Sequence, residues 1–144
     1  MSTTTTRQYT PVDVKLVLSA LWVAMLFVFA YVDIFGFFRA DVLEAALDGE
    51  VAATGIAVNQ AFLIATLIYI LLPALMVVLS LVLRPRVNRL LNIVVSLVYA
   101  VTVIASCIGE TWVYYIVGSL VEAALLVAIA WTASKWPPAA IDPR

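Results

Sequence analysis

The sequence has no histidine and only one cysteine, Cys107, among its 144 residues. A disulfide within the chain is therefore impossible, and a zinc or copper site of the usual His/Cys kind is excluded within one chain. No nucleophile stands next to a base, and no glycine-rich phosphate loop or calcium-loop pattern is present. An apolar neighbourhood is expected to leave Cys107 inert. We therefore expect a protein that is not an enzyme and that holds no cofactor or metal.

Charge is also scarce in this chain. Only 12% of the residues are charged, and the formal net charge is −1. A soluble domain has about twice that share of charged residues. Neither nucleic acid nor an acidic surface is indicated as a partner. In contrast, 65% of the residues are hydrophobic and the mean hydropathy is +1.12. This composition is typical of an integral membrane protein of one domain, whose main partner is the lipid bilayer.

Four apolar stretches are long enough to cross a membrane as helices, which takes ~20 residues for ~30 Å of hydrocarbon. They cover about residues 14–38, 58–83, 90–108 and 112–133. The runs are continuous rather than alternating, which argues against a membrane β-barrel. The first stretch is longer than the apolar part of a signal peptide, about 7–15 residues, and we expect it to be retained. The sequence thus predicts an all-α, four-helix transmembrane bundle within residues 14–136.

The loops predict how the bundle is oriented. Arginines concentrate in residues 84–89, and further bases flank the first and last spans (Arg7, Lys15, Lys135 and Arg144). The loop after the first span is acidic, with Asp41, Glu44, Asp48 and Glu50 against Arg39 alone. Basic loops mark the cytoplasmic side. We therefore expect the head (residues 1–13) and the tail (residues 137–144) in the cytoplasm, and the acidic loop outside.

The acidic loop has a helical pattern of its own. Residues 41–50 read DVLEAALDGE, in which the apolar residues can share one face. Asp41 is a plausible N-cap with Glu44 three residues later, and Gly49 would end the helix. One interpretation is a short helix lying at the outer surface. A solvated linker with a single helical turn is equally consistent with the pattern.

Each span carries one face suited to the interior of a bundle, because small and polar residues recur at helical spacing. These faces hold Ser19, Trp22, Leu26, Phe29 and Asp33; Asn59, Thr66, Pro73 and Ser80; Asn92, Ser96, Tyr99, Ser106 and Glu110; and Tyr115, Gly118 and Glu122. Such faces can be packing surfaces only, or they can line a pathway. Pro73 is expected to free a carbonyl group near mid-span, either as a tolerated kink or as one that widens a pocket.

Two carboxyl groups, Asp33 and Glu122, lie inside predicted spans with no basic residue beside them. A charge in hydrocarbon costs at least ~3 kcal/mol, so each is a candidate functional group. At ~1.5 Å rise per residue, Asp33 would lie roughly 5–9 Å below the outer surface and Glu122 roughly 15 Å deep. Arg39 could reach back to Asp33 but not to Glu122. Burial without a cation favours the protonated form of a carboxyl group.

These residues predict an outward-opening acidic and polar cavity that binds or moves a small solute, a proton or a cation. Its expected lining residues are Asp33, Asn59, Gln60, Glu110, Tyr115 and Glu122, with Tyr99 as a further hydrogen-bond partner for Glu122. The alternative is a structural or accessory membrane subunit whose buried acids only fix helix packing. Four spans form a small bundle, so the sequence also leaves homo-oligomerisation open.

Three stretches support a resemblance to a known family: residues 31–50 (YVDIFGFFRADVLEAALDGE), residues 58–60 (VNQ) and residues 108–115 (IGETWVYY). On these the chain resembles a family of small bacterial, actinobacterial-type, four-span integral membrane proteins, a domain of unknown function. The resemblance covers residues 15–136. It implies the four-span architecture and a bacterial plasma (inner) membrane location, and it supplies no activity.

Overall fold

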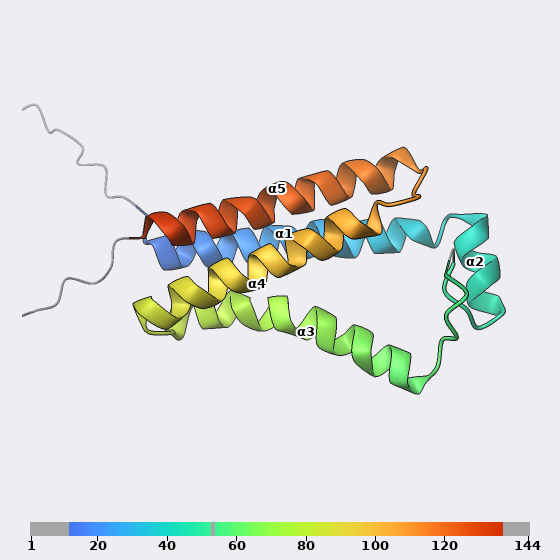
Figure 1. The fold of residues 1–144 in the computed structure, drawn as a ribbon, viewed down its shortest axis with the longest axis horizontal. Helices are drawn as coiled ribbons and strands as arrows, with labels where there is room; N and C mark the ends of the chain where they lie inside the picture. Colours follow the sequence, from blue (N-terminus) through green and yellow to red (C-terminus); the bar gives the residue numbers. More distant parts are fainter. Residues whose placement is uncertain (1–11, 53, 137–144) are drawn as a thin grey trace, which may run out of the picture.

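The computed structural model describes residues 12–52 and 54–136, and this part of the chain is helical. Its helices are α1 (Val14–Gly36), α2 (Ala40–Leu47), α3 (Gln60–Val82), α4 (Pro85–Ser106) and α5 (Val113–Lys135) (Figure 1). Four of them, all but α2, are long and apolar enough to cross a membrane. The all-α, four-helix fold class predicted from the sequence is therefore confirmed. The expected head and tail, residues 1–13 and 137–144, lie almost wholly outside the described residues.

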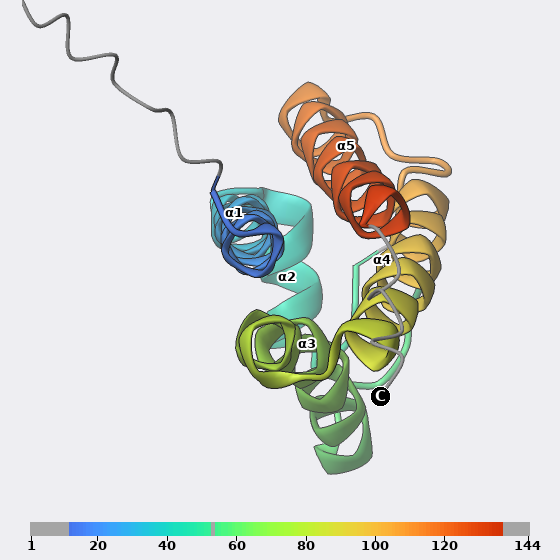
Figure 2. The same ribbon diagram turned by 90° about the vertical axis from the view of Figure 1, so that its left-hand side faces the viewer.

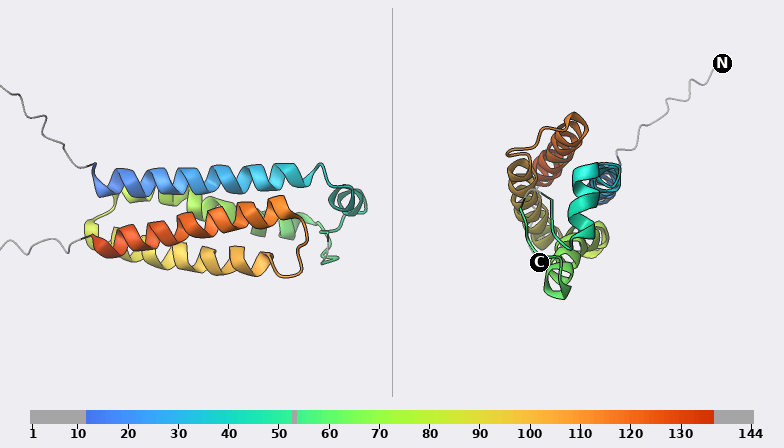
Figure 3. Two further views of the ribbon diagram at one scale, coloured as in Figure 1. Left: turned by 90° about the horizontal axis from the view of Figure 1, so that it is seen from above. Right: turned by 90° about the vertical axis from the view of Figure 1, so that its right-hand side faces the viewer.

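The four long helices lie roughly parallel or antiparallel to one another in the order α1, α5, α4, α3 around the bundle (Figure 2). The start of α1, the end of α5 and the α3–α4 connection lie at one end, called the hairpin end below (Figure 1). Helix α2 and the α4–α5 loop lie at the other, called the α2 end. Helix α2 runs crosswise to the bundle axis there (Figure 3). Helix α5 packs on α1 and α4, and α1 also packs on α3.

Helix α4 begins at Pro85 rather than near residue 90. Proline suits the first helical position, because its missing N–H would have no partner there and its φ is already helical. The connection between α3 and α4 is therefore only Leu83 and Arg84, and most of the arginine-rich stretch belongs to the helix. Arg89 donates to the carbonyl of Ser134 near the end of α5, at 3.0 Å. Arg89, near the start of α4, thus binds the backbone of a neighbouring helix rather than belonging to a loop.

Helix α2 shows that the acidic segment forms a helix rather than a linker. It begins two residues earlier than expected, since Arg39 and not Asp41 occupies the N-cap position, and Arg39 makes no side-chain capping bond. Asp41 lies inside the first turn, and both of its carboxylate oxygens bind Arg39 instead of capping the helix. The helix ends before Gly49, whose φ of +75° is readily adopted only by glycine.

A buried polar network holds the hairpin end together. The indole N–H of Trp22 on α1 donates to Asn92 Oδ1 at 2.7 Å, and Ser80 on α3 donates to the same oxygen at 3.2 Å. Asn92 donates to the Asn88 side chain at 2.7 Å, and Asn88 donates to the Ser80 carbonyl at 2.6 Å. Ser80, Asn88 and Asn92 are fully buried. The network therefore links α1, α3 and α4. Separately, the ammonium group of Lys15 on α1 donates to the carbonyls of Leu81 and Leu83 and so caps the end of α3.

Pro73 marks the point where α3 changes its relation to the bundle. Proline has no N–H, so the carbonyl of Tyr69, four residues earlier, has no helical donor. The hydroxyl of Tyr99 on α4 donates to this carbonyl. The ring of Tyr69 stacks on that of Tyr99 at 4.7 Å, and its hydroxyl contacts Thr102 at 2.6 Å. The half of α3 that precedes Pro73 diverges from α1, α4 and α5 towards the α2 end (Figure 1).

Candidate functional site

The α2 end contains an open cavity of about 930 Å³. Its walls come from the last turns of α1 and α4, the first turn of α5, the α4–α5 loop, helix α2 and the segment that follows α2. The right-hand view of Figure 3 looks at this end, with α2 lying across it. Polar and ionisable side chains among the lining residues include Asp33, Glu50, Ser106, Tyr114 and Tyr115, together with the ion-paired groups described next.

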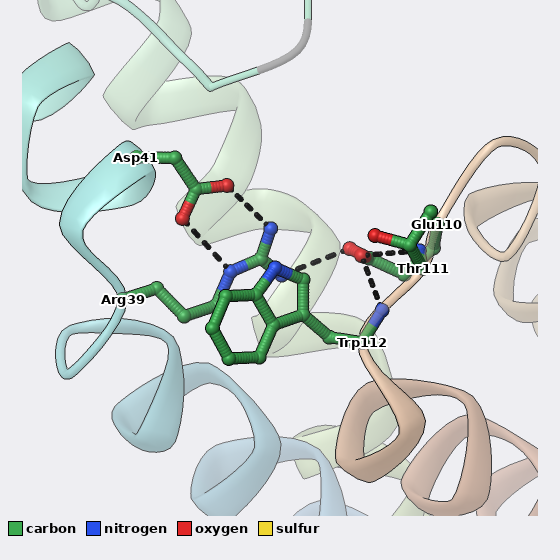
Figure 4. Close-up of polar contacts among 5 residues, drawn as sticks. All are labelled: Arg39, Asp41, Glu110, Thr111 and Trp112. Carbon is green, nitrogen blue, oxygen red and sulfur yellow. Dashed lines mark hydrogen bonds and ion pairs between the residues drawn. The ribbon is translucent and has the colours of Figure 1, made fainter.

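Arg39 joins the two sides of the cavity mouth (Figure 4). It binds Asp41 through Nη2 at 2.7 Å and through Nε at 3.2 Å, and it binds Glu110 through Nη1 at 2.9 Å. The guanidinium also lies 4.9 Å from the centre of the Trp112 ring. The Arg39 and Glu110 side chains are only 11% and 16% exposed, whereas Asp41 is 51% exposed. Arg39 therefore ties the α1–α2 junction to the α4–α5 loop.

Glu110 also shapes the start of α5. Its second carboxylate oxygen accepts the backbone N–H groups of Thr111 at 2.8 Å and Trp112 at 3.0 Å. Because Trp112 is the N-cap of α5, a carboxylate at this position satisfies N–H groups next to the helix and complements its dipole. One side chain thus both anchors Arg39 and starts a membrane-spanning helix.

The charges at the mouth stabilise one another. The hydrogen bond to Asp41 is the main cause that raises the pKa of Arg39, and it lowers the pKa of Asp41. Burial acts to raise the pKa of Glu110, but the hydrogen bonds from Arg39 and from the backbone of Trp112 and Thr111 outweigh it, so the pKa is lowered. These groups are therefore ionised at neutral pH. Arg39 is engaged by Asp41 and Glu110, so the contact with Asp33 that the sequence left open is not formed.

Asp33 lies on α1 in the cavity wall and is exposed to the cavity. Within the described part of the chain it takes part in neither of the two ion pairs and in no hydrogen bond. Tyr115 of α5 lines the same cavity and is half-buried. Asp33 is therefore a carboxyl group open to the cavity and without a protein cation.

Glu122 lies deeper, on α5, and only 3% of it is exposed. It does not line the cavity, although Asp33 and Tyr115 are close enough to interact with it electrostatically. Tyr99, which was expected to bond to Glu122, instead donates its hydroxyl to the carbonyl of Tyr69. Among the described residues, Glu122 makes no hydrogen bond that would fix its carboxyl group.

Asn59 and Gln60 do not join the other predicted site residues. Asn59 is the N-cap of α3 and accepts the N–H of Phe62 at 3.0 Å. Both residues are exposed, and neither lines the cavity. The reason is the divergence of the half of α3 that precedes Pro73, which carries the start of this helix away from α1, α4 and α5. Of the six predicted residues, the structure brings Asp33, Glu110 and Tyr115 together in the cavity wall.

The central role of Arg39 and its contact with Trp112 were not predicted from the sequence. The sequence did carry a signal for an ion pair at Arg39, because Arg39 is the only base in a stretch with several acidic residues. Tyr114 was also missed: it lines the cavity, and its buried hydroxyl lacks a hydrogen-bond partner among the described residues. No group of three or more metal-ligating side chains lies together in residues 12–52 and 54–136.

Comparison with known proteins places the chain in a family. The model of a family described as "Family of unknown function (DUF6326)" matches residues 11–141. The chain belongs to this family. The match confirms the expected membership of an uncharacterised family, and four apolar helices fit a multi-pass membrane protein. No curated protein and no solved structure was found to match the chain.

Proposed function

We propose that this DUF6326 protein is a non-enzymatic, multi-pass protein of a bacterial plasma membrane, of actinobacterial type, whose outward-opening cavity binds or moves a small cationic solute, a cation or a proton. The α2 end faces outward and the termini face the cytoplasm. This orientation is supported by the charges, since the bases of residues 84–89 lie at the hairpin end and the acids of residues 41–50 lie at the α2 end.

One observation carries the proposal: Asp33 opens into a cavity of about 930 Å³ and has no protein cation as a partner in the described chain. A carboxyl group within a membrane-spanning helix is costly unless it is protonated or paired. Arg39, the nearest base along the chain, is taken by Asp41 and Glu110. A cation or a proton from outside is the remaining way to neutralise Asp33.

Glu122 extends the acidic path inward. It lies on α5, nearly fully buried, about two helical turns from Tyr115, which lines the cavity. A second carboxyl group behind the first is the arrangement expected for a proton or cation that passes from the cavity towards the middle of the membrane. The alternative role is an accessory subunit in which Glu122 fixes helix packing, and its near-complete burial is the observation that favours it.

Ligand-dependent thermal unfolding of the purified protein tests the proposal. The probes are tetramethylammonium, spermidine, sodium, potassium and pH between 4 and 9. A ligand that binds only the folded state stabilises it by about 2.7 kcal/mol at a hundredfold excess over Kd. We expect at least one probe to raise the midpoint of the wild type and Asp33→Asn to abolish that shift.

Glu44→Gln is the matched control, because Glu44 is an exposed acid of α2 that does not line the cavity. It should leave the response to the probe unchanged. A wild type that responds to no probe and to no change of pH, or an Asp33→Asn variant that responds like the wild type, would refute the proposal. Loss of stability in Glu122→Leu, with Glu122→Gln silent, would instead support the accessory role.

A further inference from the structure

We propose that the ligand of this cavity is a membrane-borne amphiphile, with an ammonium head that pairs with Asp33 and a hydrocarbon chain that lies between α3 and the rest of the bundle. This inference rests on the proposed function, because it gives the cationic ligand of Asp33 a chemical class. Three features carry it: a gap beside α3, an apolar floor to that gap, and the position of Asp33 above the floor.

The gap is seen in the burial of the inward face of α3. Helical spacing places Phe62, Thr66, Tyr69, Pro73 and Met76 on one side of the helix. Met76 and Pro73 are buried, Tyr69 is half-buried, and Thr66 is exposed although it faces the bundle. The inward face is thus covered at Met76 and Pro73 and open at Thr66, with Tyr69 and Phe62 half-buried on either side of Thr66. A wedge therefore separates the half of α3 that precedes Pro73 from α1 and α4, in agreement with the divergence of the helices in Figure 1.

The floor of the wedge is apolar. A small pocket is lined by residues of three helices, including Leu26 and Phe29 of α1, Ile70 and Pro73 of α3, and Val103 of α4. Its free volume is about 10 Å³, which is about the space of one water-sized sphere. The floor is thus narrow enough to hold the tip of a hydrocarbon chain and too narrow for a helix, whose axis must stay ~8–10 Å from its neighbours.

Asp33 lies directly above this floor. Phe29 and Asp33 are four residues apart on α1, and Val103 and Ser106 are three residues apart on α4, so each pair shares a helix face. At ~1.5 Å rise per residue, the second member lies ~6 Å nearer the α2 end on α1 and ~4.5 Å nearer on α4. Asp33 and Ser106 both line the large cavity. The apolar wedge and the acidic cavity therefore meet along the same faces of α1 and α4.

Charge complementarity selects the head group. The single positive charge of Arg39 faces two acids at the mouth, Asp41 and Glu110, so the mouth keeps a net negative charge. Glu50 also lines the cavity and is in neither ion pair of the described chain, but Asp33 is the lining acid that lies within a long helix, beside the wedge. An ammonium group in the cavity therefore meets acidic surroundings in which Asp33 has no protein cation. The hydrocarbon chain of the amphiphile gains little free energy on entering the wedge, because the lipid that it leaves is as apolar as the wedge. Pairing with Asp33 is therefore what distinguishes an ammonium amphiphile from other lipids.

Photolabelling in neutral maltoside micelles tests this inference. The probes are dodecyltrimethylammonium with a diazirine at the chain end, and the matching alkyl sulfonate. We expect the ammonium probe to label the wedge floor, at Leu26, Phe29 or Val103, and excess unlabelled dodecyltrimethylammonium to compete. The sulfonate should label only lipid-facing side chains. Asp33→Asn should reduce floor labelling by the ammonium probe at least about tenfold.

A second pair of variants tests the wedge itself. Thr66→Trp places a large side chain at an exposed position on the inward face of α3, and should abolish floor labelling while leaving the folded protein intact. Leu67→Trp is its matched control, because Leu67 is 54% exposed and lies outside the inward face. It should label like the wild type.

The outcomes separate the two proposals. Floor labelling that is insensitive to Thr66→Trp, or equal labelling by both probes, overturns the inference. If tetramethylammonium still stabilises the wild type but not Asp33→Asn, the proposed function stands without the amphiphile. If Asp33→Asn affects neither labelling nor stabilisation, both proposals fail.

Discussion

The carbonyl group that Pro73 leaves without a helical donor provides a quantitative test of how this bundle tolerates its kink. Tyr99 on α4 donates its hydroxyl to the carbonyl of Tyr69. In Tyr99→Phe that carbonyl has no donor, while the ring and its stacking on Tyr69 are kept. An unsatisfied buried polar group costs about 1–3 kcal/mol. A hydrogen bond between membrane helices stabilises the fold by ~0.6 kcal/mol on average and by ~1.7 kcal/mol at most. We therefore expect Tyr99→Phe to destabilise the fold by about 1–2 kcal/mol.

Pro73→Ala supplies the control that makes the test specific. Alanine restores the N–H at position 73, which can bind the Tyr69 carbonyl as in an uninterrupted helix. In that background Tyr99→Phe removes only a second bond to the same oxygen, and should cost less than about 0.5 kcal/mol. The double-mutant cycle thus predicts a coupling of about 1 kcal/mol between positions 73 and 99.

The assay is reversible unfolding of all four proteins in mixed micelles, followed by far-UV circular dichroism. The cycle does not depend on the sign of the effect of Pro73→Ala alone, which combines relief of the proline penalty with any change in the angle of α3. An equal loss from Tyr99→Phe in both backgrounds would refute the reasoning. It would mean that the hydroxyl acts through packing and not through the freed carbonyl.

Two further predictions concern the contact between α1 and α5 and the mouth of the cavity. Gly118→Ala should destabilise the fold by about 1–3 kcal/mol, because the new Cβ would overlap Val32. Gly36→Ala is the control and should be nearly neutral, because its Cβ would meet only the Tyr114 hydroxyl at 3.8 Å. Similar unfolding midpoints for the two variants would contradict the close contact at Gly118. The pKa of Glu110 is lowered on folding, so its stabilisation is present above the ordinary value of 4.5 and is lost as the pH falls through the lowered value. Acid titration of unfolding should therefore show a smaller loss for Glu110→Gln than for the wild type, and equal losses would count against the ion pair.

The four spans could be predicted because continuous apolar runs of ~20 residues have few other structures available. The bounds were less certain where charge and helix coincide. The arginines near Pro85 resembled a loop by composition, yet Pro85 starts α4, and the burial of Asn88 one turn before Asn92 belongs to this helix. The four-residue spacing of the two asparagines is the signal that could have extended α4 to its true start.

Only part of the site could be predicted, because the position of the remaining residues depends on the path of α3. The face of α1 that carries Asp33 follows from helical spacing alone, and the structure places Asp33 in the cavity wall. Asn59 and Gln60 have equally polar side chains, but their position depends on how far α3 turns at Pro73, and no local pattern gives that angle. Which acids pair with Arg39 likewise depends on the α4–α5 loop, because this loop places Glu110, 71 positions away in the sequence, beside Arg39.

The two ends of the bundle differ in how they treat buried polar groups, and this difference bears on function. At the hairpin end Trp22, Asn88 and Asn92 bind one another or the backbone, so their burial costs little. A polar group retained only for packing is expected to be satisfied in this way. Asp33 and Glu122 have no such partners among the described residues, although Trp22, about three turns from Asp33 on the same helix, is fully hydrogen-bonded. An unpaired carboxyl group beside a cavity has a cost that a bound cation or proton would remove. That cost is the physical reason to look for the ligand at the α2 end.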